Sequence, residues 1–289
     1  MQRILVLRGG ALGDFIITLP ALQALRQMWP TAQIDFVGNA TAAALARDRG
    51  TVDRVESQHA APWHQLYSGE LSANFRERLA RYNLVISFWP DPDGELTRLF
   101  PLTEHQHFVF ADATPQTTPA ARHFNSVVGK LTGLAISDWV RLHEPNPQSD
   151  VVAIHPGSGS PRKNWPFDRW LKVTNWLRDT ARLRPVFILG EVEDSIATIH
   201  DVETWRNLPL TELTTRLSRS RLYLGHDTGV SHLAGACCRA GLVLFGPTNP
   251  SVWAPPNPQF LVLSEGDTLD AISVDQVIAK LTSMLAGQT

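Results

Sequence analysis

Four polar turns along the chain gather glycine, hydroxyl, carboxylate, lysine and histidine side chains. The first turn is Arg8-Gly9-Gly10-Ala11-Leu12-Gly13-Asp14. Its glycines let the backbone approach another group closely or take a positive φ. A carboxylate at the start of a helix can act as a general base, or it can only cap the helix. The first turn by itself leaves both roles open for Asp14.

The second turn runs from His155 to Pro166 and reads His-Pro-Gly-Ser-Gly-Ser-Pro-Arg-Lys-Asn-Trp-Pro. Its backbone N–H groups, its hydroxyls and the ammonium of Lys163 suit a phosphate or pyrophosphate. The spacing of a P-loop is absent, and an ordinary solvated loop is the alternative. We expect Trp165, and Trp253 further along the chain, to border the site and contact the ligand.

The third turn lies within Leu224–Ala236, where a strand is expected to end at Gly225. Asp227 and Thr228 then stand at the start of a helix, whose positive end and free N–H groups can hold a diphosphate. His232 lies one helical turn further along and would face the same way, unless it is an ordinary half-buried helical histidine. The fourth turn, Phe245-Gly246-Pro247-Thr248-Asn249-Pro250, again follows an expected strand.

Two similar halves are expected to position these turns. A polar segment with two prolines, residues 142–150, can form neither a helix nor a central strand, and it predicts a linker between domains 1–144 and 150–289. Apolar runs alternate with helical patterns in both halves, which predicts parallel sheets covered by helices. The expected strands are 4–7, 34–37, 84–88, 107–110, 151–154, 186–189, 221–224 and 242–245. The expected helices are 15–28, 40–47, 71–81, 120–131, 167–182, 191–201, 210–218, 230–237 and 274–285. The last is a closing helix that could pack back on the first domain.

Composition excludes several classes of protein. The chain of 289 residues is 43% hydrophobic and carries a net charge of −2, which does not fit a basic nucleic-acid-binding domain. Its two cysteines, Cys237 and Cys238, are adjacent, so a disulfide framework and a cysteine-based metal site are excluded. No run of about 18 apolar residues is present, and the apolar stretch at the N-terminus is too short for a signal peptide. These features favour the cytoplasm.

The turns together resemble the ADP-heptose:lipopolysaccharide heptosyltransferases of glycosyltransferase family 9. The resemblance rests most specifically on Asp227-Thr228-Gly229-Val230-Ser231-His232, which is similar to the D-T-G-x-x-H signature of that family. Lys163-Asn164-Trp165-Pro166 is similar to its K-x-W-P element, and the opening strand with Gly13-Asp14 resembles its first strand and loop. The family implies the GT-B fold, in which two Rossmann-like, doubly wound α/β domains face each other across a cleft.

The resemblance also implies roles for individual residues. The reaction would be an inverting glycosyl transfer without an essential metal or a cofactor beyond the nucleotide sugar. Asp14 would take the proton of the acceptor hydroxyl, and Lys163 would hold the charge that develops on the leaving diphosphate. The acceptor side would include Gly10, Gly13 and Arg76. The donor site would further include Ser158, Gly159, Glu191 on the ribose, Leu208 and Leu210 beside adenine, Asp227, Thr228, Gly229 and His232.

The expected reaction is transfer of heptose from ADP-heptose to a hydroxyl of a cell-envelope glycan such as the lipopolysaccharide core, at the cytoplasmic face of the inner membrane. The chain departs from the family at Gly9, Gly10 and Gly159, where hydroxyl residues are common. These positions select the donor sugar and the acceptor, so the resemblance supports the type of reaction more strongly than the substrate. Alternatives are a transferase for another nucleotide sugar or acceptor, a nucleotide-sugar epimerase, or a nucleotide-sugar binding protein.

Two further features have ordinary explanations. Asp91-Pro92-Asp93 has the D-x-D pattern of a metal site in another glycosyltransferase fold, but it reads as a turn that starts a helix. Arg76, Arg78 and Arg81 form a basic stretch that is either a solvated helix face or a docking site for an anionic acceptor or membrane surface.

Of 26 basic residues only four are lysines, and one of these is Lys163, in the K-x-W-P element.

Overall fold

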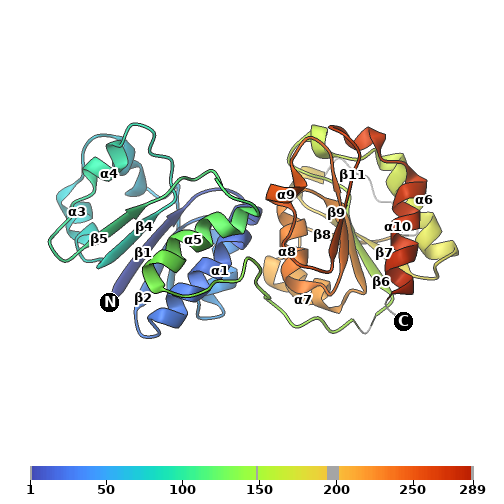
Figure 1. Cartoon of the computed structure of the whole chain (residues 1–289), viewed down its shortest axis with the longest axis horizontal. Coiled ribbons are helices and arrows are strands. Elements are labelled where there is room, and N and C mark those ends of the chain that lie inside the picture. The colour runs from blue at the N-terminus through green and yellow to red at the C-terminus, as the bar shows by residue number, and fades with distance from the viewer. Residues whose placement is uncertain (1, 148, 194–201, 288–289) are drawn as a thin grey trace. The chain divides into compact units, whose positions relative to one another are not determined.

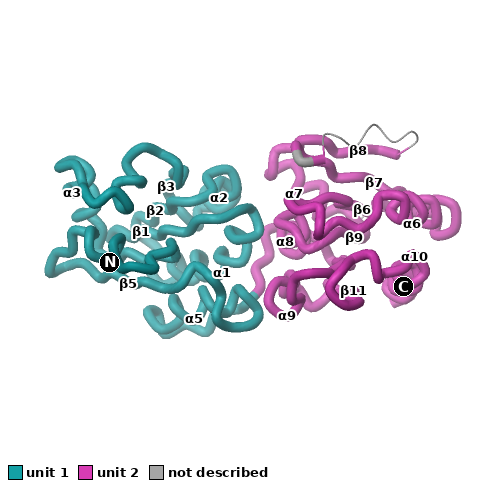
Figure 2. Tube along the Cα trace, turned by 90° about the horizontal axis from the view of Figure 1, so that it is seen from above, with its two compact units in different colours: residues 1–138 teal, residues 139–289 magenta. Residues whose placement is uncertain are grey.

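The structure is a computed structural model that describes residues 2–147, 149–193 and 202–287 (Figure 1). The chain divides into two compact units, residues 1–138 and 139–289 (Figure 2). Each unit contains one sheet of parallel strands, with helices in the connections. Most of the central strands are fully buried, as expected when helices cover both faces of a parallel sheet. The α/β class expected from the sequence is confirmed.

The units divide after residue 138, a few residues before the polar segment 142–150. Its described residues, 142–147 and 149–150, have irregular backbone, as the prolines require, but two of their N–H groups bond to helices of the second unit. Leu142 donates to the carbonyl of Ala236 (2.7 Å), and Asn146 donates to that of Ser218 (2.8 Å). The segment therefore belongs to the second unit.

The first unit has strand order β3-β2-β1-β4-β5. Leu5 and Leu7 of β1 pack on one face into a cluster with Trp63 and Phe75, while α1 packs beside α5 (Figure 1). The elements in chain order are β1 (Arg3–Arg8), α1 (Leu12–Met28), β2 (Gln33–Gly38), α2 (Ala40–Arg47), β3 (Arg54–Ser57), a 3₁₀ turn (Trp63–Tyr67), α3 (Ala73–Leu79), β4 (Leu84–Ser87), α4 (Glu95–Leu99), β5 (His107–Phe110) and α5 (Ala120–Thr132).

The second unit has strand order β11-β10-β9-β6-β7-β8. Its elements in chain order are β6 (Val151–His155), a 3₁₀ turn (Pro161–Lys163), α6 (Phe167–Asp179), β7 (Arg184–Leu189), a 3₁₀ turn (Glu191–Glu193), β8 (Glu203–Arg206), α7 (Leu210–Arg219), β9 (Leu222–His226), α8 (Gly229–Cys237), β10 (Gly241–Phe245), α9 (Pro250–Trp253), β11 (Phe260–Ser264), a 3₁₀ turn (Leu269–Ala271) and α10 (Val274–Ala286).

The strand order creates a switch point in each sheet. In the second unit the chain runs outward from β6 through β7 to β8, then returns to β9 and continues to β10 and β11 on the other side. β1 and β4 are the corresponding pair in the first unit. Ligands of doubly wound sheets bind beyond the carboxyl ends of such neighbouring strands. The turns after β6 and β9 therefore lie at the position where a ligand is expected.

Several elements differ from the expectations. The strands β3, β8 and β11, each at a sheet edge, were not expected, and β3 and β8 carry too few apolar residues to stand out. β9 continues to His226 instead of ending at Gly225. The expected helix 191–201 begins as a 3₁₀ turn, and residues 194–201 lie outside the described part of the chain.

The closing helix α10 packs against α6 of its own unit. Val277 and Leu281 are fully buried there, in the same apolar cluster as Trp165 and Trp170. The apolar face of α10 is therefore used within the second unit. No helix among the described residues is long and apolar enough to cross a membrane.

Candidate functional site

Asp14 lies in the first turn of α1, directly beyond the carboxyl end of β1. Its Oδ1 accepts a hydrogen bond from Nη2 of Arg8 (2.8 Å), and its Oδ2 accepts one from the Ala11 N–H (2.9 Å). The bond to Ala11 satisfies one N–H at the start of the helix, so Asp14 does help to cap α1. About a third of its side chain (32%) remains exposed. The carboxylate is thus both oriented and open to a ligand.

Arg8 is the partner that sequence reasoning did not assign to the site. It is nearly buried, its guanidinium lies 4.5 Å from the ring centroid of Phe124, and its Nη1 donates to the carbonyl of Ala113 (3.2 Å). Burial lowers the pKa of the Arg8 guanidinium, and the charge of Asp14 opposes this shift. Its position as the last residue of β1, six residues before Asp14, was the available signal.

One glycine of the first turn, Gly10, is required by geometry. Gly10 has φ +106°, and a Cβ placed on it would lie 2.5 Å from the carboxyl group of Asp14. Gly13 is the second residue of α1 and is partly buried. Arg76 lies on the exposed side of α3, and among the described residues no hydrogen bond or ion pair joins it to Asp14. Of the other two arginines in this stretch, Arg78 forms an ion pair with Glu56 and Arg81 forms one with Glu77.

Three turns of the second unit meet at Asp227. The Nζ of Lys163, from the turn after β6, lies 2.7 Å from Oδ2 of Asp227, which follows β9. The hydroxyl of Thr248, from the turn after β10, donates to the same oxygen (2.7 Å). Asp227 is almost buried (9% exposed), whereas Lys163 is 30% exposed. Thr248 was not among the expected site residues, although the turn that carries it was singled out.

The N-terminus of α8 lies next to this cluster. Thr228 is the N-cap residue, and its hydroxyl accepts a hydrogen bond from the Ser231 N–H (3.4 Å) and lies 3.2 Å from Nδ1 of His155. Gly229 opens the helix, and His232 is nearly buried, with its backbone N–H donating to the Thr228 carbonyl (3.3 Å). The N-terminal end of α8 carries partial positive charge beside the ammonium of Lys163.

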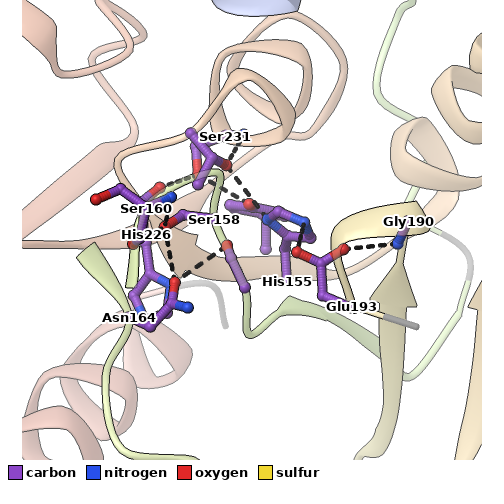
Figure 3. Close-up of polar contacts among 11 residues, drawn as sticks. His155, Ser158, Ser160, Asn164, Gly190, Glu193, His226 and Ser231 are labelled. Carbon is purple, nitrogen blue, oxygen red and sulfur yellow. Dashed lines mark hydrogen bonds and ion pairs between the residues drawn. The ribbon is translucent and has the colours of Figure 1, made fainter. Parts of the chain in front are cut away.

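The turn after β6 is organised from within (Figure 3). The hydroxyl of Ser158 lies 2.7 Å from both the Ser160 carbonyl and Oδ1 of Asn164, and Ser158 is 5% exposed. Ser158 therefore stabilises the turn and does not present its hydroxyl to solvent. Gly159 is exposed, with nothing within 4 Å of a Cβ placed on it. Trp165 is 2% exposed and lies in the apolar core, so the expectation that it contacts a ligand is wrong.

Two acids follow β7 and differ in environment. Glu191, the expected ribose ligand, is exposed. Glu193 is 5% exposed and accepts a hydrogen bond at Oε2 from the Gly190 N–H (2.8 Å). Its Oε1 lies 3.8 Å from Nε2 of His155 (Figure 3). Leu208 and Leu210, beside the start of α7, are both partly buried.

Two histidines end neighbouring strands beneath these turns. Burial lowers the pKa of His155, at the end of β6, to about 4. Burial and, to a smaller degree, His155 lower the pKa of His226, at the end of β9, to about 3. Both imidazoles are therefore neutral at pH 7, and the contact of His155 with Glu193 is not an ion pair there.

The D-x-D pattern does not form a metal centre in the described residues. Asp91 of the D-x-D pattern accepts hydrogen bonds from the N–H groups of Leu96 (2.9 Å) and Thr97 (3.0 Å) and from the Thr97 hydroxyl (2.6 Å). It therefore holds the start of α4, as the turn interpretation predicted. No cluster of three or more histidine, cysteine, aspartate or glutamate residues with metal-binding geometry occurs in the part of the chain described.

Comparisons with known proteins match this chain to heptosyltransferases. The sequence pattern of glycosyltransferase family 9 (heptosyltransferase) matches residues 111–276, more than half of the chain. Lipopolysaccharide heptosyltransferase 1 of Escherichia coli K12 is 22% identical over 98% of this chain and 100% of the relative. The enzyme of the same name from Pseudomonas aeruginosa PAO1 is 27% identical over 86% of this chain and 80% of the relative.

Solved structures share the fold. A glycosyltransferase family 9 protein from Veillonella parvula superposes with a TM-score of 0.79 at 18% identity, covering 99% of this chain and 98% of that one. The E. coli heptosyltransferase WaaC with ADP superposes with a TM-score of 0.74 at 19% identity, covering 98% and 100%. The two Rossmann-like units thus form a fold of the GT-B type. The chain belongs to glycosyltransferase family 9, the heptosyltransferase family, and is a glycosyltransferase.

Proposed function

We propose that the chain transfers a heptosyl group from ADP-heptose to a hydroxyl of a lipopolysaccharide-type glycan, with inversion at the anomeric carbon. The relatives named lipopolysaccharide heptosyltransferase 1 and the related structures with ADP support this donor and acceptor class. The observation that carries the proposal is the meeting of Lys163, Asp227 and Thr248 beside the N-terminus of α8. In this proposal the second unit binds the donor and the first unit the acceptor.

The donor diphosphate is proposed to bind between Lys163 and the start of α8. A helix N-terminus offers N–H groups and partial positive charge to phosphate oxygens. The Lys163 ammonium is a compact charge on a flexible stem, so it can turn from Asp227 toward a phosphate. Both groups stabilise the negative charge that develops on the leaving diphosphate. This stabilisation is stronger in the transition state than in the ground state.

The nucleoside is proposed to lie along the turns after β7 and β8. In doubly wound sheets an acid that follows the second strand binds the ribose hydroxyls. β7 is the second strand of this unit, and Glu193 is the acid whose carboxylate is held against its carboxyl end. We therefore assign the ribose role to Glu193 in place of the exposed Glu191. Leu208 and Leu210 remain the proposed apolar neighbours of adenine.

Asp14 is proposed to be the catalytic base. It accepts the proton of the acceptor hydroxyl while that oxygen attacks the anomeric carbon of the donor. The bond from the anomeric carbon to the diphosphate breaks as the new glycosidic bond forms, and ADP leaves with the bonding electron pair. A single displacement of this kind inverts the anomeric configuration. No step requires a metal ion, so we expect the activity to persist in excess EDTA. We place the reaction at the cytoplasmic side of the membrane.

A thermal-stability panel with ADP, GDP, UDP and their sugars tests the donor assignment. ADP at 100 times its dissociation constant is expected to add about 2.7 kcal/mol to the free energy of unfolding, and GDP and UDP less. Lys163→Ala should lose most of the ADP effect because the diphosphate loses its ammonium. Lys172→Ala is the matched control, since Lys172 is an exposed lysine on α6 paired with Asp168. If no nucleoside diphosphate raises the melting temperature, the donor assignment is wrong.

A further inference from the structure

One imidazole joins the two ends of the loop that carries Lys163. The Nε2 of His226 accepts a hydrogen bond from the backbone N–H of Trp165 (2.9 Å), and its Nδ1 lies 3.5 Å from the carbonyl oxygen of Gly157. Gly157 and Trp165 are the first and last residues of the segment 157–165, which also contains Lys163. His226 ends β9, so it ties both ends of this loop to a central strand of the sheet.

The hydrogen bonds define the state of the imidazole. A backbone N–H can only donate, so Nε2 of His226 must be the unprotonated nitrogen. The proton of the neutral ring is then on Nδ1, where it can be donated to the Gly157 carbonyl. His226 is 0% exposed, and burial keeps its pKa far below 7, so this tautomer persists at neutral pH. The protonated ring would have no acceptor for Trp165.

The surroundings keep the ring in place. The rings of His226 and Trp170 contact each other at 5.0 Å between centroids with an interplanar angle of 66°. The Ser231 hydroxyl donates to the His226 carbonyl, and the Tyr223 hydroxyl lies 2.8 Å from the same Ser231 oxygen. His226 is therefore rigid on the strand side, and its two ring nitrogens face the loop.

The next residue along the chain makes the second link to the loop. Asp227 follows His226 directly and pairs with Lys163 at 2.7 Å. When Lys163 turns toward a diphosphate it leaves Asp227, and this side-chain link is lost. The two hydrogen bonds of His226 involve the loop backbone and do not depend on where the ammonium points. They can hold the loop in one place while Lys163 changes partner.

We propose that His226 is a positioning residue for the donor site, which fixes the loop 157–165 so that Lys163 reaches the diphosphate. This inference rests on the proposed function, because it assigns the diphosphate to Lys163. His226 itself contacts no substrate in this scheme. Its effect on donor binding passes through Lys163.

Substitutions at His226 separate its two hydrogen bonds. His226→Gln places an amide oxygen near the position of Nε2 and so retains an acceptor for the Trp165 N–H. The shorter amide of His226→Asn reaches the position of Nδ1, so it can donate to the Gly157 carbonyl but loses the bond to Trp165. His226→Leu removes both bonds. We expect the ADP dissociation constant to rise roughly tenfold in His226→Leu, less in His226→Asn, and least in His226→Gln. The KM for the donor should follow the same order, and the KM for the acceptor should stay unchanged.

A double-mutant cycle shows whether the effect passes through Lys163. In a Lys163→Ala background, His226→Leu should change the ADP dissociation constant less than about twofold, because the lysine it positions is gone. His123→Leu is the matched control: His123 is a buried histidine of the first unit and should leave ADP affinity unchanged. An equal loss of affinity in both backgrounds, or no rescue by His226→Gln, would overturn the proposal.

Trypsin gives a readout that does not need a ligand. Trypsin can cleave after Arg162 and Lys163, which lie within the loop. In this scheme the ends of the loop are held only when residue 226 is histidine or glutamine. Under native conditions, His226→Leu should increase the cleavage rate at these two sites at least roughly tenfold over the unsubstituted protein and His226→Gln. Unchanged cleavage in His226→Leu would refute the positioning role even if ADP binds as proposed. Accelerated cleavage without binding of any nucleoside diphosphate would instead refute the proposed function alone.

Discussion

At the residue scale, Asp14 combines two features that a catalytic base needs. Its carboxylate is fixed by Arg8 and by the Ala11 N–H, and about a third of the side chain is exposed (32%). Arg8 is held in turn by Phe124 and by the carbonyl of Ala113. Asp14 therefore caps α1, pairs with Arg8 and still leaves part of its carboxylate open, as the proposed role of a base requires.

We predict that Asp14→Asn lowers kcat by roughly 100-fold or more while ADP affinity stays unchanged. The amide oxygen can still accept from Ala11, so the helix start is retained, but the group no longer accepts a proton at neutral pH. Turnover and ADP binding measured on one preparation test this. Asp48→Asn, at an exposed aspartate paired with Arg47, is the matched control and should retain full turnover. A near-normal rate in Asp14→Asn would remove Asp14 from the base role.

The buried histidines predict how stability depends on pH. An unfolded histidine has a pKa near 6.5, whereas burial lowers the pKa values of His155 and His226 to about 4 and about 3. Between these values and 6.5 the unfolded chain binds more protons, so the free energy of unfolding falls as the pH drops below about 6.5. Each histidine contributes a slope of up to about 1.4 kcal/mol per pH unit.

Denaturant unfolding between pH 7 and 5 measures this slope. His226→Gln should show a shallower fall than the unsubstituted protein, because one of the two groups no longer titrates. Asn175→Gln, at an exposed residue that carries no titratable group, should leave the slope as it is. Identical slopes in all three proteins would contradict the assignment of His226 as a buried neutral group.

At the element scale, the turn between β1 and α1 depends on one glycine. Gly10 has φ +106°, and a Cβ there would lie 2.5 Å from the Asp14 carboxyl group. Gly10→Ala should lower the free energy of unfolding by about 2–3 kcal/mol and should also reduce kcat, because Asp14 must move. Gly69→Ala is the control: Gly69 also has a positive φ (+86°), but nothing lies within 4 Å of its Cβ position.

The outcome for Gly69→Ala separates backbone strain from displacement of Asp14. It should lose stability through strain alone, by about 1–2 kcal/mol, and should keep its kcat. Circular dichroism for unfolding and a turnover assay at saturating substrate give the two quantities. If Gly10→Ala lost stability but kept full turnover, the carboxylate position would not matter for the chemistry.

The elements themselves could be predicted where their pattern is local. Strands such as β1 and β10 are short apolar runs bounded by turns, and helices such as α5 have a clear apolar face. The edge strands β3 and β8 were missed because an edge strand needs few apolar residues, and Glu203 of β8 even lies exposed. Element ends were also shifted, since β9 continues through His226.

At the scale of the whole molecule, both units repeat one arrangement. In each, the chain leaves a central strand, builds one side of the sheet and returns to the other side, so the switch point lies between β1 and β4 and between β6 and β9. The polar turns of the second unit follow β6, β9 and β10, which are neighbours in the sheet in the order β10-β9-β6. This order explains why three separate turns meet at Asp227.

Hydrogen exchange on the full chain tests the division of roles between the units. Adding ADP should slow amide exchange in the turns that follow β6, β9 and β10, namely residues 156–165, 227–232 and 246–250. The turn between β1 and α1 should keep its exchange rate with ADP alone, because the proposed acceptor side holds no nucleotide. In Lys163→Ala the protection should largely disappear. Protection centred on residues 9–14 would reverse the assignment of donor and acceptor units.

The sequence by itself determined the two α/β halves, the four polar turns and the residue types in them. These features are local, because hydrophobic period and turn chemistry depend on residues close together in the chain. Asp14, Lys163 and Asp227 were recognisable for this reason, and so was the family they resemble.

Only the tertiary structure decided which side chains meet. Lys163 and Asp227 are 64 residues apart and Thr248 lies a further 21 along, so their contact follows from the strand order. Burial distinguished Glu193 from Glu191, and the buried environment of His226 revealed its bonds to both ends of the loop. The physical reason is that contacts, burial and pKa values depend on the packing of distant segments, which no local pattern of residues contains.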